Sequence, residues 1–257
     1  MERPIVTESA SNLRFLGRRA LAGSWVEATM VIVIITLCTQ IPALLIDTFF
    51  GKPRVLHTEI AGEAVDISLG NASALSGIFT LLVMGAFALG ASKYFLALIR
   101  RQSHSTGQAF SGFEHFGNAL LLMLLYTIFV FLWTLLLIVP GIIAAFRYSQ
   151  AFYILADDPN KGALECLRLS KEMMRDNKLK LFCVDLSFIG WLILAAIPSG
   201  IISGVINVAT NGVGIGYFLQ SLIMLVTYIP VYIVTAYMTS TQTVFYEMVN
   251  GKNFVVQ

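Results

Sequence analysis

Long apolar stretches alternate along this chain with short polar stretches, and the polar stretches carry most of the charge. Apolar runs of about 17 residues or more are typical of membrane-spanning helices, because a helix needs about 20 residues to cross the hydrocarbon core. The runs predict an all-α, polytopic bundle of six transmembrane helices, at about residues 26–50, 74–99, 117–139, 141–156, 181–205 and 217–239. An amphipathic N-terminal segment (1–24) is expected before a single membrane domain (25–249), and a tail (250–257) after it.

The apolar run from Asn118 to Ala156 is too long to be one straight crossing, because a helix of that length would extend about 58 Å. Proline and glycine at Pro140-Gly141 are expected to break it. Two interpretations follow: one kinked crossing, or a hairpin of two crossings. Basic segments flank the run, with Arg100-Arg101 before it and six Lys and Arg residues within 161–180 after it. Basic loops prefer the cytoplasmic side, which favours the hairpin.

The positive charges as a whole support the same map. All but three of the 17 Lys and Arg residues fall on the cytoplasmic side if both termini are cytoplasmic. The exceptions are Lys52 and Arg54 in the longest outer loop, and Arg147 within the membrane. That outer loop, Gly51 to Ser73, mixes β-branched and acidic residues, which predicts a short hairpin or helix.

Composition excludes several classes of protein. Hydrophobic residues make up 57% of the chain and charged residues 12%, with mean hydropathy +0.77, whereas about 25% of a soluble domain is charged. The net charge of +2 is too small to indicate a nucleic-acid-binding protein. None of the three cysteines lies outside on this map, so no disulfide is expected. The first 20 residues contain three arginines near their end and no apolar core, so no cleavable signal peptide is expected.

Two segments have the pattern of amphipathic surface helices. The clearer one runs from Asp157 to Asn177, with Asp158 expected as the N-cap, Pro159 in the first turn and about four turns of helix on the cytoplasmic surface. It could bind membrane, bind a partner helix or pack under the bundle, and the basic residues expected to form a partner or lipid surface are Arg168, Lys171, Arg175, Lys178 and Lys180. The other lies in the N-terminal segment, capped by Ser9 or Ser11; it is either an interfacial helix on anionic lipid or a basic lead-in.

The candidate intramembrane polar site consists of Arg147, Tyr148, Gln150 and Asp185. An arginine inside a membrane costs about 2.5–3.5 kcal/mol on insertion scales, so it needs a partner or water. Asp47 and Asp185 are the candidate partners of Arg147. The functional hypothesis is a polar pathway or a contact with a substrate anion; the structural one is an ion pair between helices.

No catalytic, cofactor-binding or metal site is expected. His104 and His115 have no further Cys or His ligands near them. Glycines at 212, 214 and 216 lack the Lys-Ser/Thr of a phosphate loop. Zinc-protease and nucleophile-elbow motifs are missing from the sequence, and so is a paired-aspartate motif. The chain is therefore expected not to be an enzyme.

Four stretches carry a family resemblance: LWTLLLIVPGIIAAFRYSQAFYILADDP, ALECLRLSKEMMRDNKLKLF, LSFIGW and the closing TQTVFYEMV. They resemble the core of a bacterial integral membrane family catalogued as domain of unknown function 975. The resemblance covers most of residues 10 to 249. It implies a multi-pass protein of the bacterial cytoplasmic membrane, and it brings no established activity, substrate or site residues.

Three functions remain open from the sequence. The first is a non-enzymatic membrane protein that assembles with, regulates or protects envelope components; its partners would be the lipid bilayer and either a membrane protein or a second copy in a homo-oligomer. The second is a transporter or lipid-handling protein, which the proline-broken spans and Arg147 favour, although no internal repeat is visible. The third is an intramembrane enzyme, which the missing motifs disfavour.

Overall fold

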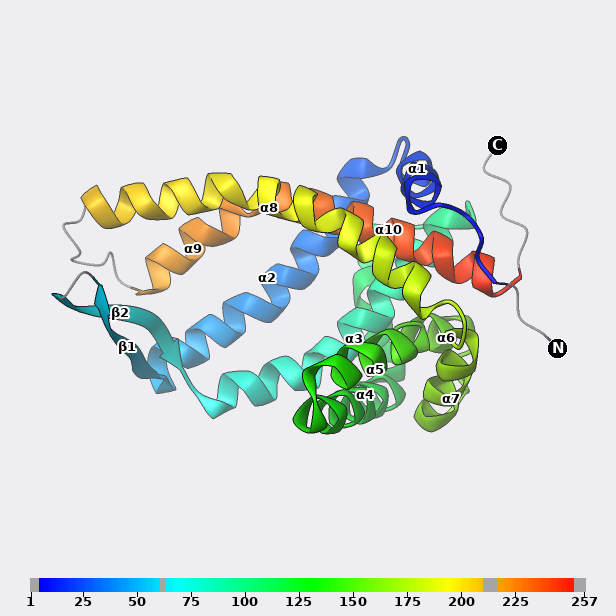
Figure 1. The fold of residues 1–257 in the computed structure, drawn as a ribbon, viewed down its shortest axis with the longest axis horizontal. Helices are drawn as coiled ribbons and strands as arrows, with labels where there is room; N and C mark the ends of the chain where they lie inside the picture. Colours follow the sequence, from blue (N-terminus) through cyan, green and yellow to red (C-terminus); the bar gives the residue numbers. More distant parts are fainter. Residues whose placement is uncertain (1–4, 61–62, 210–216, 252–257) are drawn as a thin grey trace.

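Helices form most of the chain in the computed structural model, which describes residues 5–60, 63–209 and 217–251 (Figure 1). In chain order the elements are α1 (Ala10–Ala20), α2 (Trp25–Phe50), β1 (Lys52–Ile60), β2 (Glu63–Ala72), α3 (Ala74–Ile99), the 3-10 helix η1 (Thr106–His115), α4 (Phe116–Leu136), α5 (Ile138–Tyr148), α6 (Ala151–Asp157), α7 (Ala163–Met173), α8 (Lys178–Ala209), α9 (Tyr217–Thr227) and α10 (Ile229–Val249).

Five helical stretches among the described residues are long and apolar enough to cross a membrane: Trp25–Phe50, Ala74–Ile99, Thr106–Leu136, Ile138–Asp157 and Lys178–Ile206. They correspond to the first five predicted spans. The sixth prediction, 217–239, falls on two helices, because the chain breaks at Tyr228 between α9 and α10. Pro230 lies in the first turn of α10, where a proline's missing N–H leaves no helical bond unmade.

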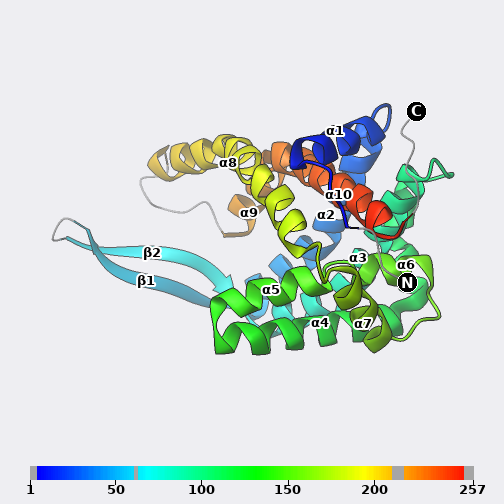
Figure 2. The same cartoon turned by 45° about the vertical axis from the view of Figure 1, so that its right-hand side comes forward.

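Helices α4 and α5 lie side by side as a tight hairpin (Figure 2). The predicted break at Pro140-Gly141 is displaced: only Leu137 is non-helical, with extended dihedrals, and Pro140 lies inside the first turn of α5. Gly141 allows the close approach, because a Cβ at that position would overlap Thr134 of α4.

The outer segment forms an antiparallel two-stranded hairpin of β1 and β2, one of the two forms expected for it. Ser9 caps α1, and its side chain accepts a hydrogen bond from the Asn12 N–H (3.1 Å). The predicted cap of α7 is wrong: the helix begins at Ala163 after Gly162, and Asp158 instead closes a turn with Asn160 and Lys161.

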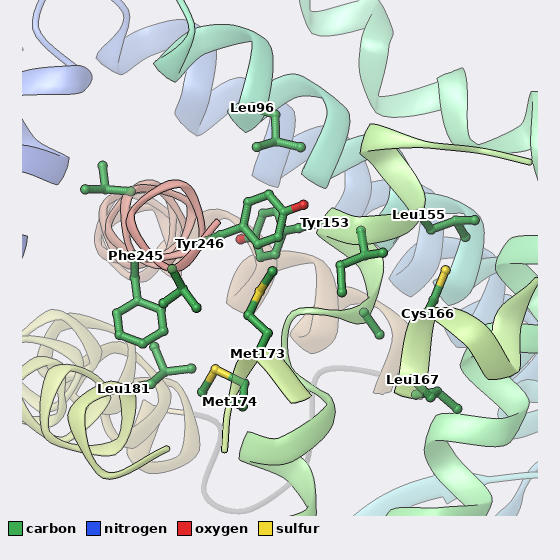
Figure 3. Packing of buried hydrophobic residues seen from close by; sticks show 14 of the residues in the cluster. Leu96, Tyr153, Leu155, Cys166, Leu167, Met173, Met174, Leu181, Phe245 and Tyr246 are labelled. Carbon is green, nitrogen blue, oxygen red and sulfur yellow. The ribbon is translucent and has the colours of Figure 1, made fainter. Parts of the chain in front are cut away.

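Buried side chains gather at one end of the molecule. Apart from Ser76, the buried residues of α3 lie between Gly85 and Ile99, and those of α10 between Ala236 and Val249. Figure 3 shows the centre of this packing, where the rings of Tyr153 and Tyr246 stack with centroids 5.2 Å apart. The opposite end carries the β-hairpin, at the left of Figure 1. We call the densely packed end the hub end and the other the far end.

The helices repeat one arrangement three times, although the sequence shows no internal repeat. Each unit has a short helix, an outgoing arm that runs toward the far end and a returning arm. The units are α1, α2 and α3; η1, α4 and α5–α6; and α7, α8 and α9–α10. Each short helix packs on the returning arm of the preceding unit, and the cycle closes: η1 lies on α3, α7 on α6, and α1 on α10.

Each short helix contacts the returning arm of the preceding unit through a small residue, and we call each of these three contacts a seat. Gly17 of α1 lies against Thr241, and Gly112 of η1 lies against the backbone of Ala86 and Gly90, where a Cβ on either glycine would overlap its neighbour. Ser170 of α7 donates a hydrogen bond to the carbonyl oxygen of Arg147 (2.9 Å). The three seats occupy similar registers, because Gly90, Arg147 and Thr241 each lie about ten residues before the end of a returning arm.

Candidate functional site

The candidate site lies where one returning arm is broken. Arg147 lies in the last turn of α5, which ends at Tyr148, and Ser149 and Gln150 separate α5 from α6, whereas α3 and α10 are continuous at the corresponding seats. The Ser170 hydroxyl bridges the break: it donates to the Arg147 carbonyl oxygen and accepts from the Gln150 N–H (3.1 Å). Ser170 is fully buried. One hydroxyl on α7 therefore satisfies two backbone groups that the break released.

The side chain of Gln150 is buried at the break and incompletely bonded. Its Nε2 donates to Ser149 Oγ (2.9 Å), while Oε1 has no hydrogen-bond partner among the described residues. A buried acceptor left without a donor costs about 1–3 kcal/mol. The break thus presents an acceptor that a ligand or water with a hydroxyl or N–H would satisfy.

Arg147 is half-buried, and neither predicted ion pair is found. Asp47 accepts a hydrogen bond from the Ser73 N–H (2.7 Å) and Asp185 accepts one from Gln242 Nε2 (3.0 Å). Within the described part of the chain, no carboxylate lies at salt-bridge distance from Arg147. Tyr148, also in the predicted site, packs its ring on Phe129 (5.9 Å between centroids).

Asp185 belongs to a second polar cluster, on α8, α10 and α6. Gln242 holds its carboxylate, and the neighbouring Thr243 bonds Tyr153 through the two hydroxyls (3.1 Å). Of the predicted site residues, the structure therefore brings Arg147 and Gln150 to one break and places Asp185 in a different set of contacts.

The most extensive charge cluster was not predicted. Arg100, which follows α3, pairs with Asp157 at the end of α6 (2.6 Å) and with Glu247 of α10 (2.5 Å). Tyr246 donates its hydroxyl to the other oxygen of Asp157 (2.7 Å). We call these four residues the hub. Burial lowers the pKa of Arg100, but the hydrogen bonds and charges of Asp157 and Glu247 outweigh burial, so its pKa is raised. The hub joins the returning arms of all three units.

The predicted basic surface is divided between two elements. On α7, Arg168 pairs with Glu172 (3.1 Å) and both are exposed, as are Lys171 and Arg175 in and just beyond the helix. At the start of α8, Lys180 donates to the carbonyl oxygen of Thr7 (3.4 Å), and Lys178 is half-buried.

The apolar face of α7 is used within the protein. Ala163, Cys166, Leu167 and Met173 are buried in the hub-end core (Figure 3). Burial raises the pKa of the Cys166 thiol to about 11. Of the three interpretations of this helix, the structure supports packing under the bundle, which leaves the charged face outward.

Metal ligands do not cluster in the described ranges: no group of three or more His, Cys, Asp or Glu side chains there could hold an ion. His104 instead lies 3.4 Å from a carboxylate oxygen of Glu27 and packs edge-on against the ring of Tyr94.

Comparison with known proteins gives one match. A family model described as "Protein of unknown function (DUF975)" matches residues 6–145 and residues 134–253. No curated protein matches, and no solved structure matches.

Proposed function

Because this chain belongs to the DUF975 family of proteins of unknown function, we propose its role from the contacts above: it is a non-enzymatic membrane protein that assembles with, regulates or protects other envelope components. The observation that carries the proposal is the orientation of α7. Its apolar face is buried in the hub-end core, while Arg168, Lys171 and Arg175 are exposed. An exposed charged face on a well-packed helix suits a protein partner of complementary charge.

The proposed location is the bacterial cytoplasmic membrane, with both termini cytoplasmic. The basic segments that favour this orientation, in α1, after α3 and around α7, all lie at the hub end. In this orientation the hub end faces the cytoplasm, and the α7 surface is available to cytoplasmic or membrane-bound partners, including a second copy of the chain.

Copurification tests this role. The tagged protein is purified in mild detergent beside the double variant Arg168→Glu, Arg175→Glu, and beside a control that reverses two exposed arginines of α1, Arg18→Glu and Arg19→Glu. We expect a stoichiometric partner, identified by mass spectrometry, that the α7 variant loses at least tenfold and the control retains. A partner retained equally by all three proteins would remove α7 from the interface. A chain that purifies alone and monomeric would contradict the proposal.

A second candidate function is lipid handling or transport, and the break between α5 and α6 favours it. Discontinuous helices form binding sites in many transporters. Here Arg147 lies three residues before Gln150, whose Oε1 has no hydrogen-bond partner among the described residues. A phospholipid headgroup that carries both a phosphate and a hydroxyl or amine would complement the two.

Lipid analysis tests the second candidate. Wild type, Arg147→Lys and Arg147→Gln are purified in mild detergent, and their bound lipids are measured by mass spectrometry. We expect one phospholipid class to be enriched on wild type, largely kept by Arg147→Lys and reduced severalfold in Arg147→Gln, because a lysine retains the charge. Identical lipid profiles on all three proteins would rule out a headgroup site at Arg147.

A further inference from the structure

The returning arm of the α4–α5 hairpin extends less far beyond its seat than the returning arms of the other two units. The three arms are measured from the seats, which lie about ten residues before the arms end. From Gly90 outward, α3 continues to Ala74, about 24 Å at the rise of an α-helix. From Thr241 outward, α10 and α9 continue to Tyr217, about 36 Å of chain. From Arg147 outward, α5 continues only to Ile138, about 14 Å.

An arm of about 14 Å is less than half of the hydrocarbon core, which is about 30 Å thick. By length and composition, Ile138–Asp157 qualifies as a crossing. Its second half, however, is a separate helix after the break at Ser149 and Gln150, and it packs in the hub-end core, where Ala151, Ile154 and Leu155 are buried. In the view of Figure 1, the outer end of the α4–α5 hairpin lies to the right of the far ends of α2, α3 and α8.

The tip of the hairpin is apolar and uncovered. Leu135 to Val139 are each 65–72% exposed, and the tip from Leu135 to Ile143 contains no polar side chain. The connection between α2 and α3 is different, because it contains Lys52, Glu63 and Asp66, as a turn in water should. An apolar tip of this kind is stable in acyl chains and costly in water.

The backbone of the tip also suits a membrane interior. Unsatisfied N–H and C=O groups are expensive in hydrocarbon, so irregular loops do not occur there in contact with lipid. Here only Leu137 departs from helix: its N–H donates to the Trp133 carbonyl oxygen (3.1 Å), and its own carbonyl oxygen accepts from the Gly141 N–H (3.2 Å). Pro140 removes one N–H that would otherwise have no acceptor.

From these observations we propose that the α4–α5 hairpin is re-entrant: it enters the membrane from the hub-end side, holds its tip among the acyl chains and returns to the same side. The membrane is then crossed by α2, by α3, by α8 and by the α9–α10 arm. This differs from the two crossings predicted for this run from its flanking charges. Both maps keep the basic segments on one side, so the charges do not distinguish them. The proposal is independent of the partner and lipid functions above.

Cysteine accessibility tests the proposal in the full-length protein. The native Cys38, Cys166 and Cys183 are replaced by serine or alanine, and a single cysteine is placed at the tip (Val139→Cys). Controls are Asn71→Cys in the connection between α2 and α3, and Lys171→Cys on α7. A membrane-impermeant maleimide is applied to intact cells and to inside-out vesicles. We expect Asn71→Cys to react in cells, Lys171→Cys in vesicles and Val139→Cys in neither, with full reaction at Val139→Cys after denaturation in SDS.

Each other outcome contradicts the proposal. Labelling of Val139→Cys in cells to the level of Asn71→Cys would mean that the hairpin crosses. Labelling in vesicles would mean that it lies on the membrane surface. A second measurement distinguishes protection of Val139→Cys by lipid from protection by protein. In nanodiscs made with lipids brominated in their acyl chains, a bimane label at Val139→Cys should be quenched severalfold more than a bimane label at Asn71→Cys. Equal quenching at the two positions would overturn the proposal.

Discussion

Glu247 is the least exposed charge of the hub, with 3% of its side chain accessible. A buried carboxylate is stable only where its charge is compensated, and here the Arg100 guanidinium supplies both Nε and Nη2 to one oxygen. Arg100 in turn is shared with Asp157, so one arginine serves carboxylates from two other units. At the residue scale, a single guanidinium therefore pairs with carboxylates from both of the other units.

Replacing Glu247 with glutamine should destabilise the protein by about 2 kcal/mol, because it removes the charge from a buried pair while Arg100 keeps Asp157. Thermal unfolding in detergent, followed by tryptophan fluorescence, measures the effect. The matched control is Arg168→Gln, which breaks the exposed pair with Glu172 and should change stability by less than about 0.5 kcal/mol. Equal effects from the two variants would contradict a hub that is held by charge.

The short helices depend on close backbone contact with the returning arms. In η1, Gly112 lies so near the carbonyl group of Ala86 that no side chain fits between them. Neither backbone can move without displacing its whole helix. At the element scale, the missing side chain at this seat sets the distance between η1 and α3.

Gly112→Ala should therefore destabilise the protein by about 1–3 kcal/mol through overpacking, and it should loosen η1 from α3. Gly117→Ala in the first turn of α4, where nothing lies within 4 Å of an added Cβ, is the matched control and should be neutral or slightly stabilising. The measurement is the midpoint of thermal unfolding together with proteolysis of the 101–105 segment. If Gly112→Ala left the unfolding midpoint unchanged, the backbones of η1 and α3 would lie farther apart than in the structure.

The elements could be predicted where polar residues bound an apolar run, as they do for α2 and α3. The break at Leu137 was misplaced because a proline marks either a break or the first turn of a helix, and both fit its missing N–H. The hub was missed because Arg100 and Glu247 lie 147 positions apart and each resembles an ordinary charged helix end. The pairing of Arg147 with Asp47 or Asp185 failed because a sequence does not reveal how helices rotate about their axes.

At the scale of the whole molecule, the chain closes on itself, since α1 of the first unit packs on α10 of the third. Tyr237 donates its hydroxyl to the Arg14 carbonyl oxygen (2.9 Å), and Ser240 donates to that of Gly17 (3.0 Å). The closed cycle means that each unit is held by both of its neighbours, so a single cut in the exposed segment after α3 leaves every seat in place.

Two fragments, 1–102 and 103–257, should therefore assemble when they are expressed together. We expect an affinity tag on the first fragment to copurify the second in equal amount, because η1 with α3 and α1 with α10 both join them. Introducing Gly112→Ala into the second fragment should lower the yield of the complex. Fragments that insert into the membrane and stay separate would contradict the closed arrangement.

The order of the hub residues along the sequence has a consequence for biosynthesis. A ribosome delivers Arg100 and Asp157 long before it delivers Glu247, so the nascent protein holds two of the three charges before the third exists. A chain whose synthesis stops in α10 then lacks the carboxylate that completes the cluster and the hydroxyl of Tyr246 that bonds Asp157. The last turns of α10 thus distinguish a chain with a closed junction from one with an open junction, and quality-control proteases would encounter the open junction in chains that stop earlier.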